Sequence, residues 1–452
     1  LMSGANSGVL ASSRFPFAMA IDLLMPKFFA KIHSNYLTPV VSILFTGLVM
    51  TLVILFLDVV KIAKLASAFM VMMFVSVNFC VVILRETSAQ WYKPTYMAPM
   101  YPLLQIFGII SGLVLLLLLG LMPLVSIIGI CIIGLIVYSF VGKNATRTGV
   151  LTNYGHRPAL FLFYKKEVTN ENLSQGSESP ILDGNLASDA GTIVPLLGNE
   201  NSPEMLVEIA SALNTRSSVQ AVNITEVPNQ TFLEALNKDT PSVISIARRL
   251  KRLSKRQSLS IDFESVVTHE VSNTVAELSN QTNCDWLIMG WNGRAHSGIL
   301  VRNPLGWLLT NVNSNFALFK DNGIRNIGKI VMALRPGRKD KDFLSVAKRL
   351  CNFYGASLTL LHIVTPDFPK QKARKMEQKS IELLAQLKIK SALKVVESNE
   401  PLDVISKVSA EHDLLVLGSP EKDSWIDILL GGGRDKFTER SACSVLRLTI
   451  ND

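Results

Sequence analysis

The sequence predicts a protein of mixed fold class, in which an α-helical membrane segment is followed by two α/β domains with parallel sheets. Residues 1–150 contain apolar runs of membrane-spanning length without a charged side chain, which predicts transmembrane helices. From residue 191 onwards, short apolar strands alternate with amphipathic helices, which predicts parallel sheets with helices on both faces. The mean hydropathy of +0.31 is higher than an ordinary soluble enzyme has, in agreement with this combination.

Four transmembrane helices are predicted. Residues 38–57 and 65–84 are uncharged runs of 20 residues, long enough as helices to cross the hydrocarbon core of a bilayer. Residues 94–142 form one uncharged stretch of 49 residues, too long for a single crossing, with a turn signal from Gly120 to Pro123. We therefore predict the third and fourth spans at about 100–120 and 123–142.

Charges beside these spans predict their orientation. Nine of the 45 Lys and Arg residues and three of the 36 Asp and Glu residues lie in residues 1–150, so this part carries +6 of the net +9. One side of the predicted spans holds seven basic residues, namely Arg14, Lys27, Lys31, Arg85, Lys93, Lys143 and Arg147. The other side holds Lys61 and Lys64. The positive-inside rule places the first group, and the C-terminal two-thirds, in the cytoplasm.

The interiors of the predicted spans contain no Asp, Glu, Lys or Arg that would serve as a proton or substrate site. Ser76, Asn78 and Ser126 are the polar exceptions, and we interpret them as partners in hydrogen bonds between helices. Because the basic excess is explained by membrane topology, nucleic acid is not an expected partner.

Two loops of the helical part have distinctive sequences. One is NSGVLASSRFPFAMAIDLLMPKFFAKIHSNYLTPV, and the other is RETSAQWYKPTYMAPMYPLLQIFGII. Both resemble loops of the amino acid–polyamine–organocation permease family, the first at the cytoplasmic end of the eighth helix and the second between the tenth and eleventh. The resemblance covers about residues 3–142. It implies a LeuT-like permease fold, and that residues 1–142 are its C-terminal part, truncated before the end of helix eight.

The resemblance also implies a function. Members are secondary transporters of amino acids or related amines in the cytoplasmic membrane, coupled to H⁺ or Na⁺. In this fold the substrate binds on two broken helices, the first and the sixth. Those helices are expected to precede the present chain, so its sequence identifies no substrate-binding residue.

Residues 143–190 are predicted to be a linker, because much of this segment is rich in Ser, Asn, Gly and Asp. The α/β pattern that follows occurs twice, over 191–321 and 327–452, with strand-end glycines Gly290 and Gly418 separated by 128 positions. Ser202 is predicted to cap the first helix of the first copy. A later helix, residues 241–257, is amphipathic and strongly basic.

The repeated pattern resembles the universal stress protein family, which implies Rossmann-like sheets with strand order 3-2-1-4-5. Nucleotide-binding members carry G-x2-G-x9-G-[ST] after the fourth strand, where backbone N–H groups approach the phosphates. By this resemblance the candidate residues for binding ATP or AMP are Gly290, Gly293 and Asn303 in the first copy and Gly418, Gly431 and Gly432 in the second.

The match to the nucleotide motif is incomplete. Asn303 stands where the closing glycine belongs, and Glu421 stands at the second glycine of the second copy. Leu197 and Arg335 occupy the positions at which those members have an Asp after the first strand. A carboxylate among phosphates is unfavourable because like charges repel.

Catalysis and metal binding are not expected. The five cysteines are far apart without a CxxC pair, and no HExxH or GxSxG motif occurs. His296 is the one histidine that lies near a candidate loop. The leading hypothesis is therefore a transporter whose two cytoplasmic domains regulate transport or assembly, with a homodimer through these domains. The alternative is a nucleotide sensor that four helices merely anchor to the membrane.

Overall fold

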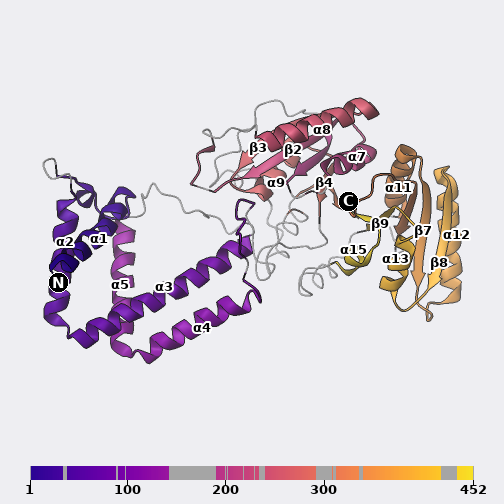
Figure 1. Cartoon of the computed structure of the whole chain (residues 1–452). Helices are drawn as coiled ribbons and strands as arrows, with labels where there is room; N and C mark the ends of the chain where they lie inside the picture. Colours follow the sequence, from indigo (N-terminus) through magenta and orange to yellow (C-terminus); the bar gives the residue numbers. More distant parts are fainter. Residues whose placement is uncertain are drawn as a thin grey trace. The chain divides into compact units, whose positions relative to one another are not determined.

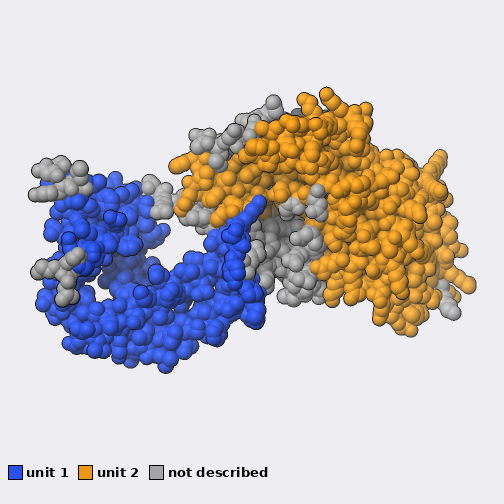
Figure 2. Space-filling model, viewed as in Figure 1, with its two compact units in different colours: residues 1–85, 92–152 blue, residues 86–91, 153–452 orange. Residues whose placement is uncertain are grey.

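The computed structural model describes residues 2–33, 38–87, 90–96, 98–141, 190–198, 200, 202–216, 218–228, 230–233, 240–291, 308, 312–334, 340–418 and 435–450. The chain divides into two compact units, shown in Figures 1 and 2. The first unit contains residues 1–85 and 92–152, and the second contains residues 86–91 and 153–452.

The first unit is built from helices. They are α1 (Met2–Ile21), η1 (Lys27–Ala30), α2 (Val40–Phe56), α3 (Val59–Thr87), α4 (Leu103–Leu118) and α5 (Leu121–Phe140). By length and composition, residues 59–85 of α3 and all of α5 can cross a membrane, whereas α2 and α4 are shorter apolar helices of 17 and 16 residues. The long apolar stretch is interrupted between α4 and α5 at Gly120, which has a φ of +104°. This is the position at which the sequence predicts a turn.

Small residues let the helices of the first unit approach one another closely. A Cβ atom at Gly112 of α4 would overlap the side chain of Val75 on α3. At Gly108 it would lie 3.2 Å from the amide group of Asn78. Close approach at glycine is typical of helices that associate in lipid. Large apolar side chains such as Leu55 (72% exposed) and Phe140 (86% exposed) lie on the surface of the unit, as lipid-facing side chains do.

The polar residues of the predicted spans form bonds within their own helices. Ser76 donates to the carbonyl of Met72 over 2.9 Å, Asn78 to that of Phe74 over 2.9 Å, and Ser126 to that of Met122 over 3.0 Å. The interpretation that they bond across helices is therefore wrong for these donors. The carbonyl four residues earlier is already within reach of a short polar side chain.

The second unit contains two copies of one α/β pattern. The first copy is β1 (Ala190–Leu196), α7 (Pro203–Leu213), β2 (Ser218–Glu226), α8 (Pro241–Gln257), β3 (Ile261–Thr268), α9 (Val271–Thr282), β4 (Trp286–Gly290) and β5 (Asn315–Lys320). The second copy is β6 (Lys329–Ala333), α11 (Asp340–Tyr354), β7 (Ser357–Val364), α12 (Lys370–Leu387), β8 (Ser391–Glu397), α13 (Pro401–Ser409), β9 (Leu414–Gly418), α15 (Lys436–Arg440) and β10 (Ser444–Thr449).

The ten strands of the described residues form one sheet, in the order β3-β2-β1-β4-β5-β10-β9-β6-β7-β8. Each copy is parallel and has the predicted order 3-2-1-4-5, which confirms the expected fold class. The last strands of the two copies pair antiparallel, with Lys320 opposite Val445 and Phe316 opposite Thr449. This pairing removes two sheet edges that would otherwise present unpaired backbone groups.

The core has one shared layer and two separate ones. On one face of the sheet, apolar side chains of α7, α8, α11 and α12 form a single cluster that includes Leu206, Leu250, Leu344 and Leu384. On the other face, each copy has its own cluster. Successive strand residues alternate between the faces. Central strands such as β1 and β9 are mostly apolar and buried on both faces, whereas the outer strand β8 is partly exposed.

Local sequence signals begin the helices of the first copy as expected. The hydroxyl of Ser202 accepts a hydrogen bond from the backbone N–H of Met205, and Pro203 occupies the first helical turn of α7. Thr240 caps α8 in the same way through the N–H of Val243. The predicted cap at Ser202 is thereby confirmed.

Candidate nucleotide site at the strand ends

The carboxyl ends of β1 and β4 are the expected place for a ligand in the first copy. The two strands are parallel neighbours, and the order of strands reverses between them. Helices α7 and α8 cover one face of the sheet, whereas α9 packs with the cluster on the other face. In an open α/β sheet such a reversal leaves a crevice at the carboxyl ends of the two strands.

A carboxylate of the chain itself occupies the end of β1. The backbone N–H groups of Leu197 and Gly198 both donate to Glu200, the second over 2.9 Å. Gly198 has a φ of +76°, which lets two consecutive N–H groups converge on one anion. A Cβ atom at Gly290, the last residue of β4, would lie 3.0 Å from Cγ of Glu200. Glu200 therefore fills the position beside Gly290 where an anionic ligand would meet these N–H groups.

The corresponding strand end of the second copy has a different environment. A Cβ atom at Gly418, the last residue of β9, would lie 3.3 Å from Cζ of Phe343 on α11. The carbonyl oxygen of Gly418 accepts a short hydrogen bond from Arg447 on β10. An aromatic ring thus lies against Gly418, where a carboxylate lies against Gly290.

A buried ion pair holds the segment around Gly418. Arg447 contacts Oδ2 of Asp435 through Nη2 at 2.7 Å and through Nε at 2.8 Å. The side chains are only 10% and 2% exposed. Asp435 also accepts from the hydroxyl of Thr438 (2.7 Å) and the N–H of Phe437 (3.1 Å), so it begins α15. This arrangement satisfies the buried carboxylate and fixes α15 beside β10.

Residues at and after the end of β5 contact α15 and the beginning of β10. Lys320, at the end of β5, donates to the carbonyl oxygen of Thr438 over 2.9 Å. Asn322 donates to the carbonyl oxygen of Cys443 over 2.8 Å, and its own N–H binds the hydroxyl of Ser444. These bonds hold α15 and the beginning of β10, at the end of the sheet opposite to Gly418, because Ser444 pairs with Leu414 and Leu448 pairs with Gly418. Sequence reasoning missed this cluster, because no local pattern links residues more than 110 positions apart.

The structure locates two of the six candidate nucleotide residues. Gly290 and Gly418 terminate the fourth strand of their copies, at equivalent positions. Gly293, Asn303, Gly431 and Gly432 lie outside the described residues, as do Arg335, Glu421 and His296. The nucleotide-binding role of all six candidates stays a prediction.

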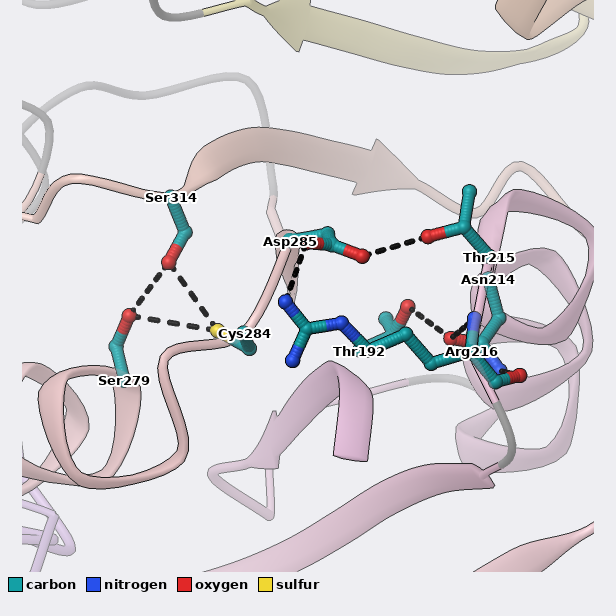
Figure 3. A network of polar contacts seen from close by, with 8 residues as sticks. All are labelled: Thr192, Asn214, Thr215, Arg216, Ser279, Cys284, Asp285 and Ser314. Atoms are coloured by element: carbon teal, nitrogen blue, oxygen red, sulfur yellow. Dashed lines mark hydrogen bonds and ion pairs between the residues drawn. The ribbon is translucent and has the colours of Figure 1, made fainter. Parts of the chain in front are cut away.

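A second polar network lies at the opposite end of the strands of the first copy (Figure 3). Asp285, directly before β4, accepts from Arg216 at 2.9 Å and from Thr215 at 2.6 Å. Asn214 accepts from Thr192 of β1 at 3.1 Å. These bonds tie the end of α7 to the beginnings of β1 and β4, so their evident role is to hold the fold.

The network has a counterpart in the second copy. Asp413, which precedes β9 as Asp285 precedes β4, accepts from the backbone N–H groups of Gly328 and Lys329 at 2.8 Å each. Beside the first network, the hydroxyls of Ser279 and Ser314 lie 2.8 Å apart and both contact the buried thiol of Cys284 (Figure 3). This group contains no base that would activate a nucleophile.

One histidine of the second copy is buried and neutral. Nδ1 of His362 donates to the carbonyl oxygen of Leu334 over 3.1 Å, so Nε2 accepts from the hydroxyl of Ser380 over 2.9 Å. Burial lowers the pKa of His362 below 6.5, despite the opposing backbone hydrogen bond. Burial also raises the pKa of the Cys351 and Cys443 thiols to about 11, which makes them unreactive at neutral pH. Among the described residues, no group of three His, Cys, Asp or Glu side chains is placed to hold a metal ion.

Apolar helices with exposed large side chains, as in the first unit, are typical of a membrane protein. The first 162 residues of the chain match the family model described as Amino acid permease. This match points to a transporter, and it confirms the expected resemblance of the helical part to amino acid permeases.

Solved structures resemble the α/β unit. A universal stress protein from Archaeoglobus fulgidus DSM 4304 is 16% identical, with a TM-score of 0.42, over 59% of this chain and 97% of its own. The cytoplasmic domain of a prokaryotic cation chloride cotransporter is 13% identical, with a TM-score of 0.38, over 58% and 95%. An A. fulgidus universal stress protein in complex with dAMP is 13% identical, with a TM-score of 0.23, over 28% and 100%. No curated protein matches the chain.

Proposed function

We propose that this chain belongs to a secondary transporter of amino acids or related amines in the cytoplasmic membrane, with the α/β unit as a cytoplasmic regulator. The observation that carries the proposal is the permease match over residues 1–162, which coincides with the apolar helices of the first unit. Coupling to H⁺ or Na⁺ follows from the family resemblance. A homodimer through the α/β unit is a further prediction, and the pairing of β5 with β10 leaves β3 and β8 as the outer strands for it.

We further propose that α2, α3, α4 and α5 all cross the membrane. Helices of 17 and 16 residues span about 26 and 24 Å at 1.5 Å per residue, close to the hydrocarbon thickness once flanking residues are counted. Exposed Leu48 (60%) on α2 and Leu117 (67%) on α4 support contact with lipid.

Uptake by reconstituted protein tests the transport proposal. The polypeptide is purified from its native membrane, placed in liposomes, and supplied with radiolabelled amino acids and polyamines under an imposed H⁺ or Na⁺ gradient. We expect concentrative uptake of at least one substrate, which stops when the gradient is dissipated. Absence of uptake for every substrate under both gradients, in protein that remains folded, would contradict the proposal.

Nucleotide sensing by the first copy is the second candidate function. The convergent N–H groups of Leu197 and Gly198 beside Gly290 favour it, because they form an anion-binding arrangement at the switch point of the sheet. Glu200 opposes it by filling that position. Titration of ATP or AMP into the full chain separates this candidate from a purely structural role of the α/β unit.

A further inference from the structure

Helix α8 presents an unusually basic surface. Over residues 241–257 it contains six Lys or Arg residues and no Asp or Glu. All six are exposed, and they are Arg248, Arg249, Lys251, Arg252, Lys255 and Arg256. Val243, Leu250 and Leu253 are buried on the opposite side of the helix. The apolar side explains how α8 packs on the sheet, whereas the basic side is exposed.

The basic residues form two stripes along the helix, which is about 26 Å long at 1.5 Å per residue. One stripe borders α7, where Arg249 pairs with Glu204 at 3.1 Å. Burial raises the pKa of Glu208 on α7, and the nearby charge of Arg256 opposes this rise. The other stripe holds Arg248, Lys251 and Lys255 at helical spacing, with Ile244 (44% exposed) one turn before them. At 3.6 residues per turn, this second stripe lies about 100° around α8 from the first.

A surface with only basic charges distinguishes α8 from helices α12 and α13. Its counterpart in the second copy, α12, carries five basic residues together with Glu377 and Glu382. On the opposite face of the sheet, α13 contains Asp403 and Lys407. A solvated helix surface usually mixes charges of both signs, as α12 and α13 do. A helix surface that carries only positive charges favours an anionic partner instead.

We propose that α8 docks on the anionic lipid headgroups of the membrane in which the apolar helices of the same chain are inserted. Membrane insertion keeps α8 at a high effective concentration of headgroups. Exposed Ile244 is suited to the boundary between headgroups and acyl chains. Single-stranded nucleic acid fits less well, because α8 has no aromatic side chain on which a base would stack. The inference rests on the membrane anchoring and cytoplasmic side proposed above, and not on transport.

Quenching of a dye on α8 by headgroup-labelled lipid tests the proposal in the full chain. Ser245→Cys carries the dye in a background of Cys80→Ala and Cys131→Ala, since the other cysteines are buried. Nanodiscs contain phosphatidylcholine alone or with phosphatidylglycerol. We expect stronger quenching with the anionic lipid, and its loss at high salt. A dye at Lys407→Cys, on the opposite face, is the positional control.

Two triple variants distinguish an effect of the second α8 stripe from an effect of the total charge of the α/β unit. Arg248→Gln/Lys251→Gln/Lys255→Gln is expected to lower the docking constant roughly a hundredfold, since each basic residue near an anionic leaflet contributes about a fivefold factor. Lys372→Gln/Arg374→Gln/Lys375→Gln removes the same charge from α12 and is expected to leave docking nearly unchanged.

Three outcomes would overturn the proposal. They are equal quenching with and without phosphatidylglycerol, equal losses in the two triple variants, and binding of a short single-stranded RNA that depends on the α8 stripe while lipid has no effect. Uptake assays on the same variants are read separately. Absent uptake with intact docking counts against the transporter proposal alone.

Discussion

Arg349 of α11 donates a hydrogen bond through Nη1 to the carbonyl oxygen of Leu213, the last residue of α7, over 3.0 Å. The final carbonyl groups of a helix lack partners within the helix and carry its negative dipole end. A guanidinium group from the second copy therefore provides a hydrogen-bond donor for a terminal carbonyl group of a helix in the first copy. With the shared apolar cluster and the β5–β10 pairing, this bond indicates that the two copies fold as one unit.

Replacing Arg349 tests whether the two copies fold as one unit. Arg349→Met is expected to lower the free energy of unfolding by about 1 kcal/mol, because one partly exposed hydrogen bond to a helix end is lost. Lys348→Met, which removes the neighbouring positive charge, is the matched control. Chemical denaturation followed by circular dichroism is expected to show one transition for the α/β unit in both variants. Two separate transitions, or equal losses of stability, would contradict the interpretation.

Removing the carboxylate at the end of β1 tests whether the first copy has a latent anion site. Glu200→Ala frees the N–H groups of Leu197 and Gly198, so we expect it to bind AMP or ATP at least tenfold more tightly than the unmodified chain does. Calorimetric titration of the full chain measures this change. Glu204→Ala, nearby on α7, removes the same charge and is expected to leave nucleotide binding unchanged. If all three proteins bind alike, Glu200 does not control the site.

Breaking the buried ion pair tests its role in holding the second strand end. Asp435→Asn leaves Arg447 buried without a counter-charge, and such a loss typically costs about 3–5 kcal/mol of stability. The pair between Arg440 and Asp403, which lie 3.1 Å apart and are 60% and 51% exposed, is the control. Asp403→Asn is expected to change stability little, since water screens exposed pairs. Thermal unfolding measures both, and similar Tm changes would refute the assignment.

Burial of His362 predicts a pH dependence of stability. Its folded-state pKa lies below the ordinary 6.5, so the unfolded chain binds the proton more readily. The stability that the neutral imidazole contributes is fully present above pH 6.5 and is lost as the pH falls through the folded-state pKa. Unfolding free energies between pH 8 and pH 5 are expected to fall less steeply in His362→Gln than in the unmodified protein. An unchanged slope would mean that other groups carry the effect.

Elements encoded by contiguous residues could be predicted from the sequence. The bounds of α8, the cap at Ser202 and the break at Gly120 all follow from local chemistry. The antiparallel pairing of β5 with β10 could not be predicted, since each edge strand permits several partners. Nor could the placement of Glu200 beside Gly290, because a loop conformation brings together residues 90 positions apart.

Close approach of α3 and α4 gives the last prediction, at a glycine of the first unit. A Cβ atom at Gly112 would overlap the Val75 side chain, whereas one at Gly47 of α2 would have nothing within 4 Å. We expect Gly112→Val to destabilise the helix pair by about 1–3 kcal/mol, the usual cost of overpacking, and to reduce uptake in liposomes.

Gly47→Val is the matched control for that change, and it is expected to leave the thermal stability in detergent and the uptake unchanged. Adding Val75→Ala to Gly112→Val restores space between the helices and is expected to recover part of both losses. If Gly47→Val is as harmful as Gly112→Val, or if Val75→Ala gives no recovery, then the two helices do not depend on this contact. Recovery of stability without recovery of uptake would instead show that the contact supports folding and that transport requires more than the packing of this pair.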